Sequence, residues 1–399
     1  MNVSRLLICP FILVLILTSC LNSELDKYKV ANDVIDQIRQ SHAPDRRVAI
    51  MDIKATIYND VILLSGETDR SEIPESLISK FAEKGLEAKS EINLLPESNL
   101  NGSIYGVINN SVSNIRSQPK HSAELATQAL LGTNVKVLKK MGSWYLIQTP
   151  DKYISWIDAG GLVVMNENTH DVWNRAKKII YLESSGYVFV SPELESGERV
   201  ADIVMGCQLK LVSELEEYFE VQYPDGRVGF VEKSKSEKYN QWLTSIEFQK
   251  QLIKEKALGL MGTPYLWGGT SSKGMDCSGF TKTVYFMNGL IIPRDASQQV
   301  NEGLKVDTNL SFTGLEVGDL LFFGSPATDS TKQRTTHVGL WIGDNQFIHA
   351  SKNVRISSVD ENSPNYDEPN VKRYLGSQRY LKNITAGIKD LTEPLRLNK

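Results

Sequence analysis

The hydrophobic and polar positions of residues 47–96 change their period within one short stretch. Apolar and polar residues alternate over 52–57, which predicts a half-buried strand, and the apolar run at 61–64 predicts its return strand. Apolar residues within 73–81 fall on one helix face, and 91–95 predicts a last strand. The pattern therefore predicts a small ββαβ unit.

The middle of the chain contains an internal repeat with an offset of 74 residues. The copies align without a gap from 132 to 157, and the matched pairs include Gly132 with Gly206, Lys136 with Lys210, Gln148 with Gln222, Pro150 with Pro224, and Asp151 with Asp225. Both copies predict short alternating strands with Pro-Asp turns, as in small β-barrels. They resemble bacterial SH3-like modules at about 104–166 and 178–235.

Two segments of the mixed α+β C-terminal part carry candidate chemistry. The residues after Cys277 predict a helix that begins near this cysteine. A thiol at a helix N-terminus meets the positive end of the dipole, which predicts a lowered pKa, a nucleophilic thiolate and nearby amides for an oxyanion. Cys207 is instead predicted to be a small buried residue of a barrel strand, and neither cysteine is expected to be oxidised.

The second segment is a predicted hairpin formed by residues 337–343 and 346–352. If Ile342 pairs with Gln346 across a loop at 343–345, His337 and His349 lie on the same sheet face, one diagonal apart. His337 could then accept the thiol proton and His349 could orient it. A two- or four-residue loop would place the histidines on opposite faces, so this geometry depends on the loop.

Five strings then occur in order: GTPYLWGG at 262–269, DCSGF at 276–280, GDLLFF at 318–323, HVGLWIG at 337–343 and FIHAS at 347–351. Together they closely resemble the NlpC-type family of papain-like cysteine peptidases, which act on bacterial cell-wall peptides. The resemblance covers about residues 248–382. It implies that Cys277 is the nucleophile, His337 the base and His349 the third, orienting residue.

The resemblance also implies a substrate, the bond from γ-D-glutamyl to the diamino acid in peptidoglycan stem peptides. A secreted chain with two SH3-like modules before such a domain resembles γ-D-glutamyl-L-diamino acid endopeptidases that act as dipeptidyl-peptidases. In those relatives the first module walls off the site, so that only stems with a free N-terminal L-Ala fit. A buried ammonium requires carboxylate partners.

Several positions match the substrate-binding residues of those relatives. The matches are Glu124 and Asp295 for the amine, Tyr153 and Tyr265 as site tyrosines, and Asp276 and Ser278 beside the nucleophile. Ala296 departs from the expected serine, which removes one hydroxyl contact to the D-Glu carboxylate.

Three of these positions have alternative interpretations. Glu124 could be a solvated surface charge, and Tyr265 could pack in the core. Asp295 could pair with Arg294 or cap the helix that starts near Ser297.

The first residues have the shape of a bacterial secretory leader. Arg5 precedes an apolar run at 6–17, and Leu17-Thr18-Ser19-Cys20 resembles a lipobox, which implies cleavage before Cys20 and a lipid on it. An ordinary signal peptide or an uncleaved anchor is the alternative. We expect a membrane-anchored lipoprotein of the cell envelope, on the periplasmic or outer-membrane face.

The predicted fold class is multi-domain α+β: two small SH3-like β-barrels followed by a papain-like α+β peptidase domain, with the ββαβ module before them. The predicted organisation is a signal peptide at 1–19, a tether with a short helix at 20–46, the module at 47–96, barrels at 104–166 and 178–235, the peptidase domain at 248–382 and a tail at 383–399. The sequence VILLSGETD at 61–69 makes the module at 47–96 similar to the envelope module called BON.

Composition narrows the remaining classes. The 399 residues carry 44 Lys and Arg against 48 Asp and Glu, a net charge of −4, so no nucleic-acid partner is expected. Two of the four cysteines lie in the leader, which excludes a disulfide framework. There is no HExxH or CxxC pattern, so we expect no metal or cofactor. We also expect a monomer. The alternatives are a DL-endopeptidase of intact wall and a non-catalytic wall-binding lipoprotein.

Overall fold

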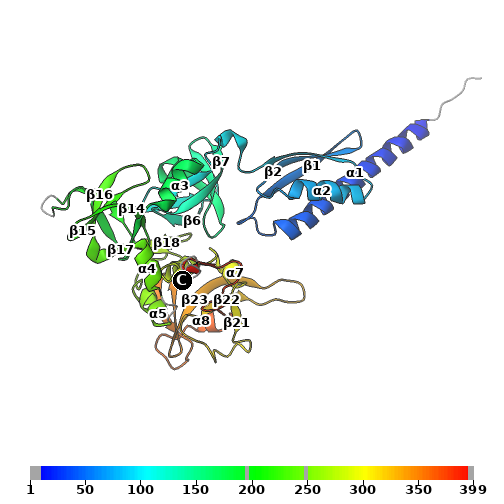
Figure 1. The fold of residues 1–399 in the computed structure, drawn as a ribbon. Coiled ribbons are helices and arrows are strands. Elements are labelled where there is room, and N and C mark those ends of the chain that lie inside the picture. The colour runs from blue at the N-terminus through cyan, green and yellow to red at the C-terminus, as the bar shows by residue number, and fades with distance from the viewer. Residues whose placement is uncertain (1–9, 194–196, 247–249, 394–399) are drawn as a thin grey trace, which may run out of the picture. The chain divides into compact units, whose positions relative to one another are not determined.

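The computed structural model describes residues 10–193, 197–246 and 250–393, and it describes no side chains before residue 25 (Figure 1). The backbone of the predicted lipobox at 17–20 lies within the first helix, but the Cys20 side chain is outside the described part. Across the described helices, none has both the length and the apolar character that a membrane crossing needs. The chain divides into two compact units, Met1–Asn99 and Leu100–Lys399.

The N-terminal unit contains the predicted ββαβ elements. These are β1 (Met51–Tyr58), β2 (Val61–Thr68), α2 (Ile73–Glu83) and β3 (Ala88–Leu94), preceded by α1 (Pro10–His42). β2 lies in the centre of the sheet, antiparallel to β1 and parallel to β3. Ala31, Val34 and Ile35 of α1 are buried in the same core as Leu77 and Phe81 of α2. The second half of the segment expected to be a tether is therefore part of the folded unit.

The first SH3-like module is a seven-stranded antiparallel sheet in the order β10-β4-β7-β8-β9-β5-β6. Its strands are β4 (Tyr105–Ile108), β5 (Val112–Arg116), β6 (Leu125–Leu130), β7 (Asn134–Met141), β8 (Trp144–Gln148), β9 (Ile154–Asp158) and β10 (Leu162–Met165). The helix α3 (Glu167–Arg175) leads to the second module.

The second module is also a seven-stranded antiparallel sheet, in the order β13-β12-β16-β15-β14-β11-β17. Its strands are β11 (Lys178–Tyr181), β12 (Gly186–Phe189), β13 (Arg199–Ile203), β14 (Gln208–Glu214), β15 (Tyr218–Gln222), β16 (Val228–Glu232) and β17 (Ser236–Lys238). Lys136 pairs with Gln148 in the first module, and Lys210 pairs with Gln222 in the second. The 74-residue offset therefore holds at the level of strand register.

The peptidase domain has a six-stranded sheet in the order β21-β26-β22-β23-β24-β25. Its strands are β21 (Leu304–Val306), β22 (Leu320–Ser325), β23 (Arg334–Gly343), β24 (Gln346–Ser351), β25 (Asn353–Ser358) and β26 (Tyr374–Arg379), and its helices include α4 (Tyr239–Ser245), α5 (Lys250–Leu258), α6 (Cys277–Phe286), α7 (Ala296–Gln299) and α8 (Glu368–Val371). Phe280 and Val284 of α6 pack in one buried cluster with Val338 and Leu340 of β23. The sheet thus supports the helix that begins at Cys277.

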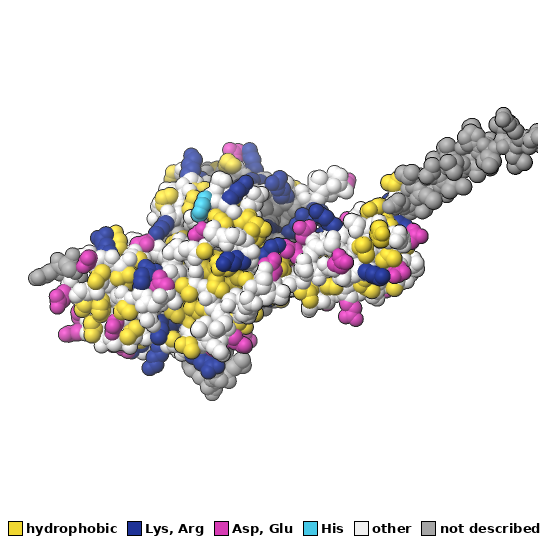
Figure 2. Space-filling model, turned by 90° about the horizontal axis from the view of Figure 1, so that it is seen from above, with side chains coloured by type: hydrophobic (Ala, Val, Ile, Leu, Met, Phe, Trp, Pro, Cys, Tyr) yellow, Lys and Arg dark blue, Asp and Glu magenta, His cyan; other side chains and the backbone are white. Residues whose placement is uncertain are grey.

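Two short pairings complete this domain. The hairpin β18 (Thr270–Ser271) and β19 (Gly274–Met275) leads directly into α6, and β20 (Leu290–Ile291) pairs with β27 (Lys389–Asp390). The described part of the segment expected to be a tail is therefore paired with the domain. On the face shown in Figure 2, basic side chains are interspersed with acidic ones.

Candidate active site

The nucleophile candidate Cys277 is the first residue of α6, as the sequence predicts. Asp276 is the N-cap, and its carboxylate accepts a hydrogen bond from the backbone N–H of Gly279 at 2.7 Å. A Cβ on Gly279 would lie 2.0 Å from the carbonyl oxygen of Gly269, so the close approach of the two backbones requires glycine. The cap and this contact together fix where the helix begins.

The environment of the thiol differs from the sequence expectation. Cys277 is only 7% exposed. Burial, reinforced by the Asp276 carboxylate, raises the pKa of the thiol to about 12, although the backbone N–H groups of Val338 and Ser278 act in the opposite direction. The predicted lowering of this pKa by the helix N-terminus is therefore wrong for this arrangement, because desolvation outweighs the helix-end amides.

The two histidines meet on one face of the hairpin. His337 Nε2 lies 2.7 Å from His349 Nδ1, and both side chains are buried. Leu340 pairs with Ile348, which is the predicted register. The predicted three-residue loop is wrong: the turn residues are Asp344 and Asn345, both with positive φ, and a bulge before Gly343 adds the extra residue.

His349 has two further partners that the sequence analysis did not identify. Its Nε2 lies 3.0 Å from Ser357 Oγ and 3.6 Å from the buried carboxylate of Asp367. If Nε2 of His349 carries its proton toward these oxygens, Nδ1 accepts from His337 Nε2–H. Nδ1 of His337 is then the free basic nitrogen.

Burial keeps both rings neutral near pH 7. It lowers the pKa of His349 to about 4, which Asp367 partly opposes. Burial and the neighbouring His349 hold the pKa of His337 well below its usual value. The site therefore contains a neutral thiol and a neutral imidazole.

Arg294 is the main buried charge of the site, and the sequence analysis considered it only as a partner of Asp295. It is 1% exposed, and its guanidinium binds the Asp276 carboxylate at 2.6 and 3.1 Å. It also donates to Ser278 Oγ at 2.9 Å and to Thr127 Oγ1 of the first module at 2.9 Å. The polar groups of Asp276 and Ser278, predicted to hold the peptide, thus hold Arg294.

The remaining predicted residues surround this centre. Tyr153 of the first module is 9% exposed and lies close enough to Arg294 to act on its charge. Burial raises the pKa of Tyr265 to about 12, and Cys277 and Asp276 add to this; the backbone of Tyr265 pairs with Met275, two residues before the nucleophile. Tyr265 is 36% exposed, so the alternative of core packing does not describe it.

The two acids predicted to bind an amine have structural partners of their own. Glu124 is exposed and accepts a hydrogen bond from Trp267 Nε1 at 2.6 Å, across the contact between module and peptidase domain. Asp295 is the N-cap of α7, its backbone N–H donates to Gln298 Oε1 at 3.1 Å, and its Oδ1 lies 3.8 Å from Arg294. Both alternatives considered for Asp295 are therefore present in the structure.

Two segments of the chain match known protein families. Residues 262–373 match the NlpC/P60 family, and residues 115–162 match the bacterial dipeptidyl-peptidase SH3 domain. The chain is 31% identical over 268 residues to the γ-D-glutamyl-L-lysine dipeptidyl-peptidase of Bacillus cereus, covering 65% of this chain and 76% of that protein. The chain belongs to the NlpC/P60 family.

Two further relatives agree with this assignment. Dipeptidyl-peptidase 6 of Lysinibacillus sphaericus is 27% identical over 271 residues, which cover 64% of this chain and 92% of that protein. The crystal structure of an NlpC/P60 family protein from Bacillus cereus superposes with a TM-score of 0.58 at 26% identity, covering 69% of this chain and 99% of that one. This NlpC/P60 protein is therefore a cysteine peptidase, a hydrolase of cell-wall peptides.

A metal centre has no candidate in the part of the chain that the structure describes. No group of three or more His, Cys, Asp or Glu side chains there is arranged to hold an ion.

Proposed function

We propose that this NlpC/P60 protein is a dipeptidyl-peptidase that cleaves the γ-D-glutamyl–L-diamino acid bond of stem peptides with a free N-terminal L-Ala. Cys277 is the nucleophile, His337 the base and His349 the residue that orients the base. The observation that carries the proposal is the 2.7 Å contact between the histidines on β23 and β24, beside the helix that begins at Cys277.

The chemistry follows from the neutral state of these groups. Because the pKa of the Cys277 thiol is raised and that of His337 is lowered, proton transfer to His337 Nδ1 accompanies attack of Sγ on the γ-glutamyl carbonyl. The backbone N–H groups of the first turn of α6 stabilise the resulting oxyanion. His337 then donates the proton to the departing diamino-acid amine, and water hydrolyses the thioester by the same route.

The preference for a free amine rests on the first module. Glu124 is exposed at the contact with the peptidase domain, and Asp295 lies next to the buried Arg294. Two carboxylates suit one substrate ammonium, and acetylation would remove its charge and add bulk. The relatives in Bacillus cereus and Lysinibacillus sphaericus are named dipeptidyl-peptidases, which supports the same specificity.

The test compares kcat/KM for L-Ala-γ-D-Glu-L-Lys and its N-acetyl form. We expect a preference for the free amine of roughly two to three orders of magnitude, because acetylation removes the ammonium charge and adds bulk in a site that the first module closes. Comparable values would contradict the proposal and favour the DL-endopeptidase of intact wall. A folded protein that cleaves neither peptide nor isolated sacculi would instead support a wall-binding lipoprotein.

We also propose that the protein is anchored to the envelope through a lipid on Cys20, on the strength of the Leu-Thr-Ser-Cys sequence at 17–20. Cys20→Ala should abolish incorporation of a labelled fatty acid and release the protein from the membrane fraction. Unchanged labelling of that variant would contradict the proposal, with Cys207→Ser as the matched control.

A further inference from the structure

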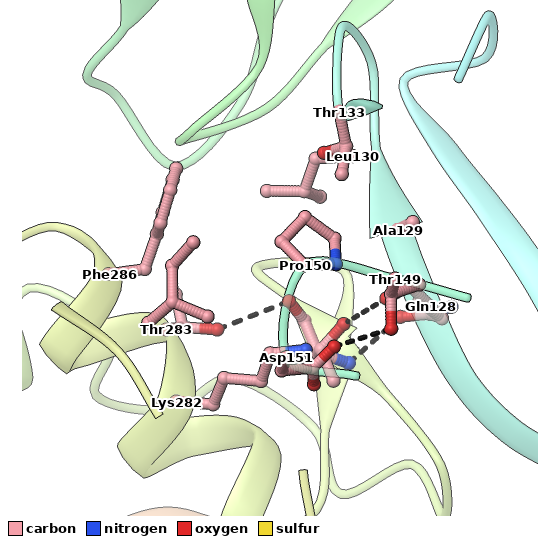
Figure 3. Close-up of a pocket in the computed structure, with 12 residues that line it drawn as sticks. Gln128, Ala129, Leu130, Thr133, Thr149, Pro150, Asp151, Lys282, Thr283 and Phe286 are labelled. Atoms are coloured by element: carbon pink, nitrogen blue, oxygen red, sulfur yellow. Dashed lines mark hydrogen bonds and ion pairs between the residues drawn. The ribbon is translucent and has the colours of Figure 1, made fainter. Parts of the chain in front are cut away.

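A turn of the first SH3-like module docks against the helix of the nucleophile (Figure 3). Asp151 Oδ2 lies 2.6 Å from Lys282 Nζ on α6, and the two side chains are 1% and 18% exposed. Burial opposes ionisation of Asp151, yet the Lys282 charge keeps its pKa below the usual value. This is a buried ion pair between the module and the peptidase domain.

The same turn contains Tyr153, one of the residues predicted to bind substrate. The backbone N–H and the hydroxyl of Thr149 both donate to the carbonyl oxygen of Tyr153, at 2.9 and 3.1 Å. These bonds close the turn as one unit, so that Asp151 and Tyr153 move together. Tyr153 is near enough to Arg294 to act on its charge, and Arg294 holds the residues on both sides of the nucleophile.

The second module provides an internal reference for this turn. At the offset of 74 residues, the N–H of Tyr223 donates to the carbonyl of Arg227 at 2.8 Å, as Thr149 does to Tyr153. Asp225 there binds Arg227 within its own turn at 2.7 Å and Asn109 at 2.8 Å, and its side chain is 30% exposed. The turn therefore forms without a partner on the peptidase domain, and the Lys282 pair is an addition specific to the first copy.

The contact around the ion pair is incompletely packed. A cavity of about 80 Å³ lies beside it, lined mainly by apolar groups that include Leu130, Pro150 and Phe286 (Figure 3). The hydrogen bonds that Gln128 receives from Thr270 and Ser271 join neutral groups, so they carry less electrostatic attraction than a charge pair. Removing one member of a buried pair leaves the other uncompensated.

We infer that the Asp151–Lys282 pair is a positioning device for substrate specificity: it holds the first module on α6 so that Tyr153 and Glu124 complete the pocket for the free amine. This inference rests on the proposed function. Asp151 and Lys282 act through the docked turn and are positioning residues. Their effect should appear in substrate preference, measured as KM for the free-amine peptide, before it appears in bond cleavage.

The experiment measures kcat and KM for L-Ala-γ-D-Glu-L-Lys and its N-acetyl form in the full chain. Asp151→Asn and Lys282→Met should each lower the preference for the free amine by about tenfold or more, mainly through KM. Lys282→Arg should retain the preference because it keeps the charge. The matched control Asp225→Asn, at the equivalent turn, should change it less than about twofold.

Three results would overturn the inference. The first is a preference within twofold of wild type in folded Asp151→Asn and Lys282→Met proteins. The second is an equal loss for both peptides, which would indicate a general structural role. The third applies if Asp151→Asn and Lys282→Met fold poorly. Lys282→Arg should then keep both the wild-type melting temperature and the wild-type substrate preference. A Lys282→Arg protein that is stable but has lost the preference would contradict the inference. A wild-type enzyme without any preference would refute the proposed function itself.

Discussion

The two SH3-like modules have the same strand register and differ in what surrounds them. In both, the strand pair that precedes the Pro-Asp turn has a bulge at equivalent positions, Val137/Lys139 and Leu211/Ser213. The aspartate that follows is buried against α6 in the first copy and bound within its own turn in the second. The two copies therefore share one strand register, and they differ in the partner that the same turn meets.

The largest expected effect sets a baseline in which both modules stay intact. Cys277→Ala and His337→Ala should each lower kcat by several orders of magnitude for every substrate, because one member of a nucleophile–base unit is worth nearly the whole unit. Both variants should keep the wild-type melting temperature and circular dichroism. Residual turnover near wild type in a folded Cys277→Ala protein would exclude this cysteine as the nucleophile.

The next effect separates the first module from the second. Arg294→Met should destabilise the protein by about 3–5 kcal/mol, because it leaves the Asp276 carboxylate buried without its counter-charge. Denaturant unfolding measures the loss, and hydrogen exchange should locate it in strand β6, which contains Thr127, rather than in the second module. Equal loss of protection in both modules would show that Arg294 does not act through the first one.

Acidification should act on the peptidase domain while leaving the two turns unchanged. Because the pKa of His349 falls to about 4 on folding, from roughly 6.5 when unfolded, the unfolded chain binds more protons in this window. Stability should therefore decrease as the pH falls from 6.5 to 4, by about 3 kcal/mol from this residue.

Asp151 and Asp225 both have lowered pKa values and stay ionised throughout that range. The measurement is the free energy of unfolding against pH, with His349→Asn as the reference. A slope that is unchanged in this variant would contradict the assignment of the acid sensitivity to His349.

The smallest expected effect is in the second module. Arg227→Ala removes an exposed pair with Asp225 and a contact of the guanidinium with the Tyr223 ring, so the loss of stability should be under about 1 kcal/mol. Thermal unfolding and the peptide assay together measure it. A change in substrate preference comparable to that of Asp151→Asn would remove the distinction between the modules.

Local pattern was sufficient to predict much of this architecture. Alternation and helix period identified the ββαβ unit, and the 74-residue offset identified the modules down to the pairing of Lys136 with Gln148. The hairpin of His337 and His349 was predicted in the correct register, although its turn was not, because a bulge and a shorter turn together give the same sum. Sequence period alone does not distinguish these two solutions.

Long-range charge was beyond the reach of the sequence. Arg294 meets Thr127 across 167 positions and Lys282 meets Asp151 across 131 (282 − 151), so no local spacing identifies either partner. The sequence showed Asp295 next to Arg294. It did not show that Arg294 is buried, and a buried guanidinium requires a closer carboxylate than Asp295. The protonation state of the Cys277 thiol was mispredicted for the same reason. The helix N-terminus can be recognised from neighbouring residues, whereas desolvation depends on residues distant in the sequence.

At Gly268 and Gly269 the main chain lies in close contact with neighbouring main chain, with no room for side chains. A Cβ on Gly268 would meet the carbonyl oxygen of Leu125 in the first module at 2.2 Å, and a Cβ on Gly279 of α6 would meet the carbonyl oxygen of Gly269 at 2.0 Å. A single added methyl group would therefore force either the module or the nucleophile's helix out of place. The protein should therefore tolerate substitutions throughout the repeat cores more readily than at Gly268 and Gly269, in natural variants and engineered libraries alike.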